Sequence, residues 1–395
     1  MKTNRLYIPI LALALAAGFT SCDDFLDREP MSTVDPEVYF TQVSQLESYA
    51  NQLYENILPS HGNWSYGIFG EDSGTDNQTG ATANNRFAEG LWKVPNKDDD
   101  NWKFEWIYRC NFFLQNVLEK YGTKEDGSEN TIMGDLASIK HYIGEIYFLR
   151  AYEYFKRYQK YGDFPIITEP LADDMEILRE SNKRMPRTEV ARFILDDLKK
   201  AYDFLSAKEM ATTRINKDAA LLLRSRVALF EGTWLKSFEG TAFVPNGEGW
   251  PGASKDYNKD YQFKSGSIDK EINYFLEQAI ADAETISEAY KNDLAENKGL
   301  QQSVNDPANP YYDMFAQEDL SGVREVLLWR QYGRGLVTHN VNVAANRGNY
   351  MNGVTRAFVN NFLMANGEPV YKHGSYADGD GYYRGDKTIA DVRIN

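Results

Sequence analysis

Apolar residues recur along most of the chain at intervals of three and four, the spacing that places one apolar stripe on one face of an α-helix. The pattern predicts amphipathic helices over 35–57, 104–121, 139–158, 194–205, 220–234 and 268–286. Neighbouring helices of this kind bury their apolar faces by packing as antiparallel pairs. The sequence therefore predicts a mainly α-helical fold.

Turn and capping residues mark several ends of these helices. Asp35 followed by Pro36 is a typical start, with an N-cap residue before a proline at the first helical position. Pro59 closes the first helix, and Gly162 with Pro165 beyond it closes the helix that covers 139–158.

Two long irregular stretches, 60–103 and 237–267, separate the helices and are rich in Gly, Asn, Asp and aromatic residues. Loops of this length are usually functional. From residue 305 the helical pattern gives way to two runs that favour short strands, 325–331 and 336–343. The region 305–395 is expected to be short, irregular and partly β. Since no predicted helix or strand closes it, it is also expected to be incomplete.

The first 21 residues have the pattern of an export signal. Lys2 and Arg5 precede an apolar run of 14 residues, 6–19, which is too short to span a bilayer and is therefore interpreted as a cleaved signal peptide. Cys22 follows directly after small residues, as in a lipobox, which predicts that Cys22 is lipidated and becomes the first residue of the mature chain. Ordinary cleavage near 16–18 is the alternative.

Charge and hydropathy exclude several classes of protein. The chain has 395 residues with 43 Lys and Arg against 58 Asp and Glu, and its net charge of −15 disfavours nucleic acid as a partner. Charged residues make up 26% and hydrophobic residues 42%, a balance that argues against intrinsic disorder. A mean hydropathy of −0.56 excludes a polytopic membrane protein.

The positive candidates for ligand binding are aromatic and polar residues in the loops, since aromatic residues make up 14% of the chain. Aromatic rings can stack on the apolar faces of sugars, while amides and carboxylates bond their hydroxyls. The candidates are Trp64, Tyr66, Asp76, Asn77, Trp92, Trp250 and Tyr350. The alternative for each ring is that it packs beneath its own loop.

No catalytic or metal-binding motif is found, and no cofactor is expected. His61, His141, His339 and His373 are isolated, so a zinc site lacks ligands. The acidic runs 98–100 and 378–381 do not fit a calcium loop and are interpreted as solvated turns. Cys110 is expected to be a core residue. The sequence does not decide whether two carboxylates flank a cleft, as a glycoside hydrolase needs.

Several separate segments together resemble the SusD/RagB family of surface nutrient-binding lipoproteins. The most specific are Gly144-Glu145-Ile146-Tyr147-Phe148-Leu149-Arg150-Ala151 and the turn Gly162-Asp163-Phe164-Pro165. The stretch after Cys22, with Leu26, Asp27 and Pro30, is similar to the start of mature family members. Further similar segments are 194–201, 218–230, 325–328, 362–367 and 391–393.

This resemblance implies a tetratricopeptide-like stack of helix pairs over 22–304, with long ligand-binding loops and a C-terminal region, 305–395, packed around them. It implies a lipid-anchored, surface-exposed protein of the outer membrane, with Asp23 and Asp24 as the export signal. It further implies a non-enzymatic protein that captures oligosaccharide and delivers it to a SusC-like TonB-dependent transporter. Oligopeptide binding, as in RagB, is the alternative, and a surface glycoside hydrolase or a ligand-free scaffold is less well supported.

Overall fold

The computed structural model describes residues 38–60, 72–80, 102–124, 126–206, 211–299, 305–333, 338–339, 353–363, 366–369 and 372. Its helices are α3 (Val43–Ile57), α4 (Glu105–Tyr121), α5 (Leu136–Tyr161), α6 (Met175–Ser181), α7 (Arg187–Phe204), α8 (Lys217–Ser237), η3 (Pro251–Ser254), α9 (Ile268–Tyr290), α10 (Pro310–Ala316) and α12 (Arg356–Asn360). Among these described residues, no helix is long and apolar enough to cross a membrane.

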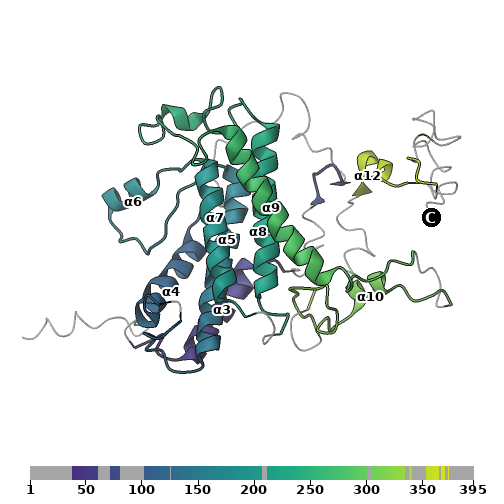
Figure 1. Cartoon of the computed structure of the whole chain (residues 1–395), viewed down its shortest axis with the longest axis horizontal. Helices are drawn as coiled ribbons and strands as arrows, with labels where there is room; N and C mark the ends of the chain where they lie inside the picture. Colours follow the sequence, from purple (N-terminus) through teal and green to yellow (C-terminus); the bar gives the residue numbers. More distant parts are fainter. Residues whose placement is uncertain are drawn as a thin grey trace, which may run out of the picture.

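The long helices form a stack in which α5, α7, α8 and α9 lie side by side (Figure 1). Cross-helix contacts give their directions. Arg187 at the start of α7 bonds Tyr158 near the end of α5, and Tyr290 at the end of α9 bonds Asp218 at the start of α8. Successive helices therefore run antiparallel, as the apolar pattern predicts, and the mainly helical fold is confirmed.

The centre of the stack is α5, in which every residue from His141 to Ala151 is buried. Gly144 allows this helix to approach the end of α7 closely. A Cβ atom at this position would lie 2.8 Å from Leu205 Cγ and 3.0 Å from the Leu205 backbone nitrogen. Cys110 is fully buried in the same core, as predicted, and burial raises the pKa of its thiol.

Pairs of arginine and buried carboxylate fix the register between helices. The pairs are Arg150 with Asp197, Arg187 with Glu231, Arg192 with Glu271, and Arg224 with Asp282. Each carboxylate is at most 4% exposed, so a shifted register would leave an unpaired charge in the core.

The predicted helices are found, with one correction at the start of the first helix. The first helix begins at Val43, not at Asp35: residues 38–41 form turns, and Phe40 has a φ of 59°. The ring of Phe40 is fully buried against Phe113, at 5.3 Å between centroids, which draws this segment out of a helical path. Residues 35–37 lie outside the described residues.

The strand predicted over 325–331 is wrong. This segment is irregular, and its backbone is held at Trp329, whose N–H donates to Thr212 O at 3.1 Å, rather than by a neighbouring strand. The run 336–343 lies almost entirely outside the described residues. Among the described residues, the strands instead form a short antiparallel pair, β1 (Gln78–Thr79) with β2 (Gly353–Val354).

Candidate functional site

The first long loop and the C-terminal region meet at the β1–β2 pair. Gln78 lies opposite Val354, and Thr79 opposite Gly353. Beside the strands, the Thr355 N–H donates to Asn77 O at 2.9 Å and the Thr355 hydroxyl donates to Asp76 O. Residues 76–79 and 353–355 are called the loop junction below.

Three polar side chains of the loop junction have groups without a hydrogen-bond partner among the described residues. Asp76 is exposed and Asn77 half-buried, and neither side chain makes a hydrogen bond to another described residue. The amide oxygen of Gln78 is buried, again without a partner in this part of the chain. The carboxylate and amides can accept hydrogen bonds from hydroxyl groups, and the amides can also donate them.

The loop junction brings two of the predicted site residues, Asp76 and Asn77, against the C-terminal region. Tyr350 precedes β2 by three positions, but it lies outside the described residues, as do Trp64, Tyr66 and Trp92. The site residues outside the described ranges are Trp64, Tyr66, Trp92 and Tyr350, together with Cys22, Asp23 and Asp24.

Trp250 is the predicted ligand-binding ring that the structure describes, and it is only 4% exposed. Its indole N–H donates to Asp163 Oδ2 at 2.8 Å, and its ring lies over Gly252, where a Cβ atom would come within 2.1 Å of it. Burial raises the pKa of Asp163 despite this bond and one from the Arg187 N–H. The geometry fits the alternative in which the ring packs beneath its own loop.

The same loop presents a different aromatic ring, that of Tyr257, which is 43% exposed. Tyr257 lines a shallow depression with Lys183, whose ammonium lies 5.7 Å from the ring centroid, and with residues 254–256. This depression lies beside η3.

A deeper opening lies where the end of α3, the start of α4 and the last turns of α5 meet, and we call it the α4–α5 cleft. Its volume is about 280 Å³. The lining residues are Asn56, Lys103, Glu105, Trp106, Glu153, Lys156, Arg157, Lys160 and Tyr161. This cleft combines aromatic rings with several cations, and the sequence analysis did not identify it.

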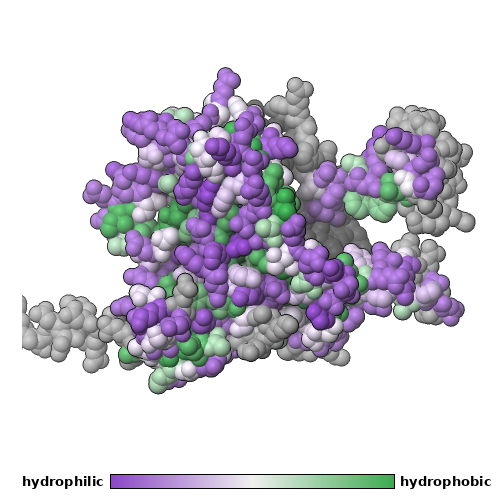
Figure 2. All heavy atoms as spheres, in the orientation of Figure 1, coloured by the Kyte–Doolittle hydropathy of each residue, from purple (hydrophilic) through white to green (hydrophobic). Residues whose placement is uncertain are grey.

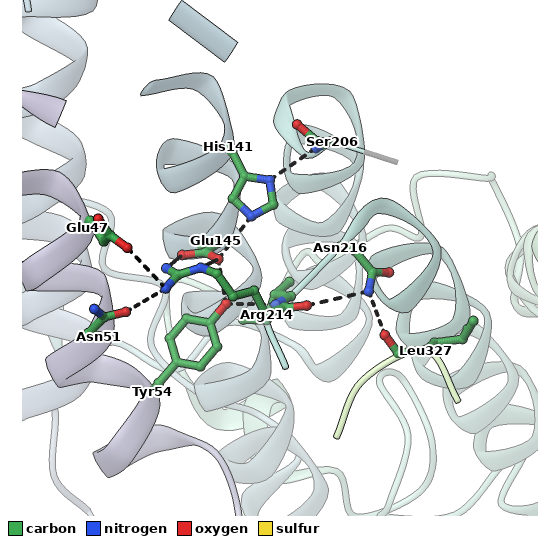
Figure 3. A network of polar contacts seen from close by, with 10 residues as sticks. Glu47, Asn51, Tyr54, His141, Glu145, Ser206, Arg214, Asn216 and Leu327 are labelled. Carbon is green, nitrogen blue, oxygen red and sulfur yellow. Dashed lines mark hydrogen bonds and ion pairs between the residues drawn. The ribbon is translucent and has the colours of Figure 1, made fainter. Parts of the chain in front are cut away.

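A buried polar network centred on Glu145 joins four parts of the chain (Figure 3). Arg214 binds the Glu145 carboxylate with two hydrogen bonds, from Nε at 2.9 Å and from Nη2 at 2.6 Å. The Tyr54 hydroxyl donates to Glu145 Oε1 at 2.6 Å and accepts the Ile215 N–H at 2.8 Å. Burial and then the Glu145 charge raise the pKa of Tyr54 well above its ordinary value.

His141 completes this network inside the stack. Its Nδ1 accepts the Ser206 N–H at 3.2 Å, so in the neutral ring Nε2 carries the hydrogen and donates to Glu145 Oε1 at 3.1 Å. Asn216, the N-cap of α8, extends the network by donating to Leu327 O at 2.5 Å (Figure 3). Because His141 and Glu145 are fully buried, the network anchors the C-terminal region to the stack and does not face a substrate.

Metal binding finds no support in the described part of the chain, where no group of three or more His, Cys, Asp and Glu is arranged to hold an ion. His141 is held by protein groups on both nitrogens. The acidic runs 98–100 and 378–381 lie outside the described residues.

Comparisons with known proteins agree with this fold. A family profile of SusD-like proteins, described as starch-binding and associating with the outer membrane, matches residues 24–229, just over half of the chain. A crystal structure of a SusD-like carbohydrate binding protein from Bacteroides fragilis is similar with a TM-score of 0.55 and 14% identity. That similarity covers 85% of this chain and 56% of that one, and it shows a common fold.

Two relatives come from Formosa agariphila. SusD-like protein P25 is 26% identical over 234 residues, which cover 54% of this chain and 41% of that protein. SusD-like protein P2 is 25% identical over 258 residues, which cover 63% of this chain and 47% of that protein. The matched part of the chain therefore spans less than half the length of these relatives.

Proposed function

Because this chain belongs to the SusD-like family, we propose that it captures an oligosaccharide at the cell surface and delivers it to a partnered, SusC-like TonB-dependent transporter. The observation that carries the proposal is the family match over 24–229, whose description is starch-binding and association with the outer membrane. The protein acts by binding, without catalysis.

The ligand site in this proposal is centred on the loop junction. Asp76 and Asn77 present side chains that no described residue bonds, and they lie where two distant parts of the chain meet. Trp64, Tyr66, Trp92 and Tyr350 are proposed to supply the rings on which the sugar stacks. Such a division between stacking rings and a few polar groups is typical of small-molecule sites.

The anchor in this proposal is a lipid on Cys22, preceded by a cleaved signal peptide of residues 1–21. Several acyl chains on one residue hold a protein stably on a membrane, where a single chain would not. Asp23 and Asp24 direct the anchored protein to the outer face.

Isothermal titration of the purified mature chain against a panel of neutral oligosaccharides and oligopeptides tests the binding function. We expect a glycan to bind, and Asp76→Ala with Asn77→Ala together to weaken that binding about tenfold or more through the lost hydrogen bonds. The matched control is Asp269→Ala with Asn292→Ala, which removes the same groups from exposed positions on and after α9.

If oligopeptides bind and no glycan does, the proposed carbohydrate ligand is wrong and the protein is a peptide-binding one. Reducing-sugar release by the wild-type chain above buffer would contradict the non-catalytic role. Retention of a TonB-dependent transporter by the tagged chain, from outer membranes of the native cell, tests the partnership.

A further inference from the structure

The α4–α5 cleft carries a charge opposite to that of the chain as a whole. Its lining includes four cationic side chains, Lys103, Lys156, Arg157 and Lys160, and two carboxylates. The chain has a net charge of −15. A local excess of cations on a strongly acidic protein attracts anions to that place and leaves the rest of the surface repelling them.

The two carboxylates of the cleft are already engaged. Glu153 is only 1% exposed and pairs with both Arg157 and Lys156. Glu105 accepts a hydrogen bond from Arg109 Nη2 at 3.3 Å. Lys103 is exposed and forms no ion pair with a described residue. Its positive charge is therefore not neutralised by either carboxylate.

Two of these cations, Arg157 and Lys156, also hold the walls of the cleft in place. Arg157 Nε donates to Lys103 O at 2.9 Å and so joins α5 to the start of α4. Lys156 Nζ donates to Ile57 O at 3.1 Å and joins α5 to the end of α3. Because the walls are fixed by the protein's own bonds, a ligand need not order them, and this lowers the cost of binding.

Rings and an amide complete the lining. Trp106 and Tyr161 are both half-buried, and Tyr161 is held edge-to-face by Trp102 at 5.0 Å between centroids. The Asn56 amide nitrogen donates to Gln52 O at 2.8 Å, so the amide oxygen is the group that can accept a hydroxyl. A phosphate or chloride ion alone needs no ring or amide acceptor, whereas a sugar with an acidic group uses both.

From these contacts we propose that the α4–α5 cleft is a second subsite, which binds the negatively charged group, carboxylate or sulfate, of an acidic oligosaccharide. The subsite rests on the proposed glycan-binding function and extends it to a substrate class. The cations bind the anionic group, and Trp106 and Asn56 contact the sugar that carries it. Neutral glycans do not use this subsite.

The test compares ligands that differ in charge alone. Binding of the mature chain is measured by titration with oligogalacturonate and with the same oligomer as its methyl ester, at low and at physiological salt. A sulfated and an unsulfated oligomer of one neutral glycan form the second arm and identify which anionic group is preferred. We expect the acidic form to bind more tightly than its neutral counterpart, by a ratio that falls with added salt.

Variants place the effect in the cleft. Lys103→Gln with Lys160→Gln should weaken binding of the preferred acidic oligomer roughly three- to tenfold and leave its neutral counterpart unchanged. The matched control is Lys199→Gln with Lys270→Gln, which removes the same charge from exposed positions on α7 and α9. Equal losses in the two double variants would mean that only net charge acts, and would overturn the subsite.

The remaining outcomes separate this inference from the proposed function. Neutral oligomers that bind as tightly as acidic ones in both arms would overturn the subsite and leave glycan binding intact. Failure of every glycan to bind would overturn both. Binding of oligoglutamate with the same sensitivity to Lys103→Gln and Lys160→Gln would show a general anion site and overturn its assignment to a saccharide.

Discussion

At the scale of single residues, the stack is held by buried charged and polar groups as well as by its apolar stripes. Glu271 is an example: its carboxylate accepts both Arg192 Nε at 2.7 Å and Arg192 Nη2 at 2.9 Å. Burial alone would raise the pKa of Glu271. The hydrogen bonds from Arg192 and Ser265 outweigh the effect of burial, so the pKa of this carboxyl is lowered from its ordinary value of 4.5.

This pair predicts a pH-dependent contribution to stability. Since the folded-state pKa of Glu271 lies below its unfolded value, the contribution is complete above about pH 4.5 and is lost as pH falls through the folded-state pKa. Glu271→Gln should lower the free energy of unfolding at pH 7 by about 1.5–3 kcal/mol, and the difference from wild type should shrink on acidification. Denaturant unfolding at several pH values measures it.

Glu277→Gln is the control for this variant, because Glu277 is exposed on the same helix. Glu277→Gln should change stability little at any pH. A difference between Glu271→Gln and wild type that stays constant or grows as pH falls would contradict the assigned direction of the pKa shift.

Tyr54 provides a second test at this scale, in the network centred on Glu145. Tyr54→Phe removes the hydroxyl that donates to Glu145 and accepts the Ile215 N–H, so it leaves two buried groups short of a partner. We expect a loss of about 1–3 kcal/mol in the free energy of unfolding. Tyr108→Phe, at a side chain 46% exposed on α4, should be nearly neutral by the same denaturation measurement.

At the scale of elements, the closeness of α5 to the end of α7 depends on Gly144. Gly144→Ala places a methyl group 3.0 Å from the Leu205 backbone nitrogen, which can move only if the helix end moves. The gain in helix propensity of about 1 kcal/mol does not offset this clash, so we expect a net loss of about 1–3 kcal/mol and a lower Tm.

The control for Gly144→Ala is Gly322→Ala, where an added Cβ atom meets nothing within 4 Å. Its Tm, measured by calorimetry, should stay close to that of wild type. A Gly144→Ala protein as stable as wild type would mean that the packing of α5 on α7 is looser than the structure describes.

The helices could be predicted because the apolar residues of most of them follow a simple period, as those of α4 and α9 do. The start of α3 could not, since the burial of Phe40 against Phe113 is a contact between distant parts of the chain. The segment 325–331 has the residues of a strand, but its backbone bonds Thr212 and the Asn216 side chain and pairs with no described strand, so tertiary contacts override its propensity. The short helix α6 was not predicted, because its seven residues are too few to repeat an apolar period.

At the scale of the whole molecule, the face drawn in Figure 2 is mainly hydrophilic, with apolar side chains in small groups. One apolar group lies on α6, where Met175, Ile177 and Leu178 are exposed and the helix projects away from the stack (Figures 1 and 2). The candidate glycan site could be predicted in part: the polar and aromatic residues of the first long loop pointed to Asp76 and Asn77, but the contact between Asp76 and Thr355, 279 positions apart, required the fold.

Placement in the cell gives a prediction at this scale. Asp23→Ala with Asp24→Ala should keep the lipid anchor on Cys22 but retain the protein on the inner face of the outer membrane. Protease treatment of intact cells should then remove the wild-type protein and spare the double variant. Equal removal of both proteins would contradict the assignment of these two residues as the export signal.

In the proposed function, a glycan is held where the first long loop meets the C-terminal region. Hydrogen exchange of the mature chain, measured with and without the neutral oligosaccharide that binds most tightly, tests this position. We expect the glycan to slow exchange in 72–80 and 353–363 and to leave α8 and α9 unchanged. Slowed exchange confined to the helical stack, with both of these segments unaffected, would contradict it.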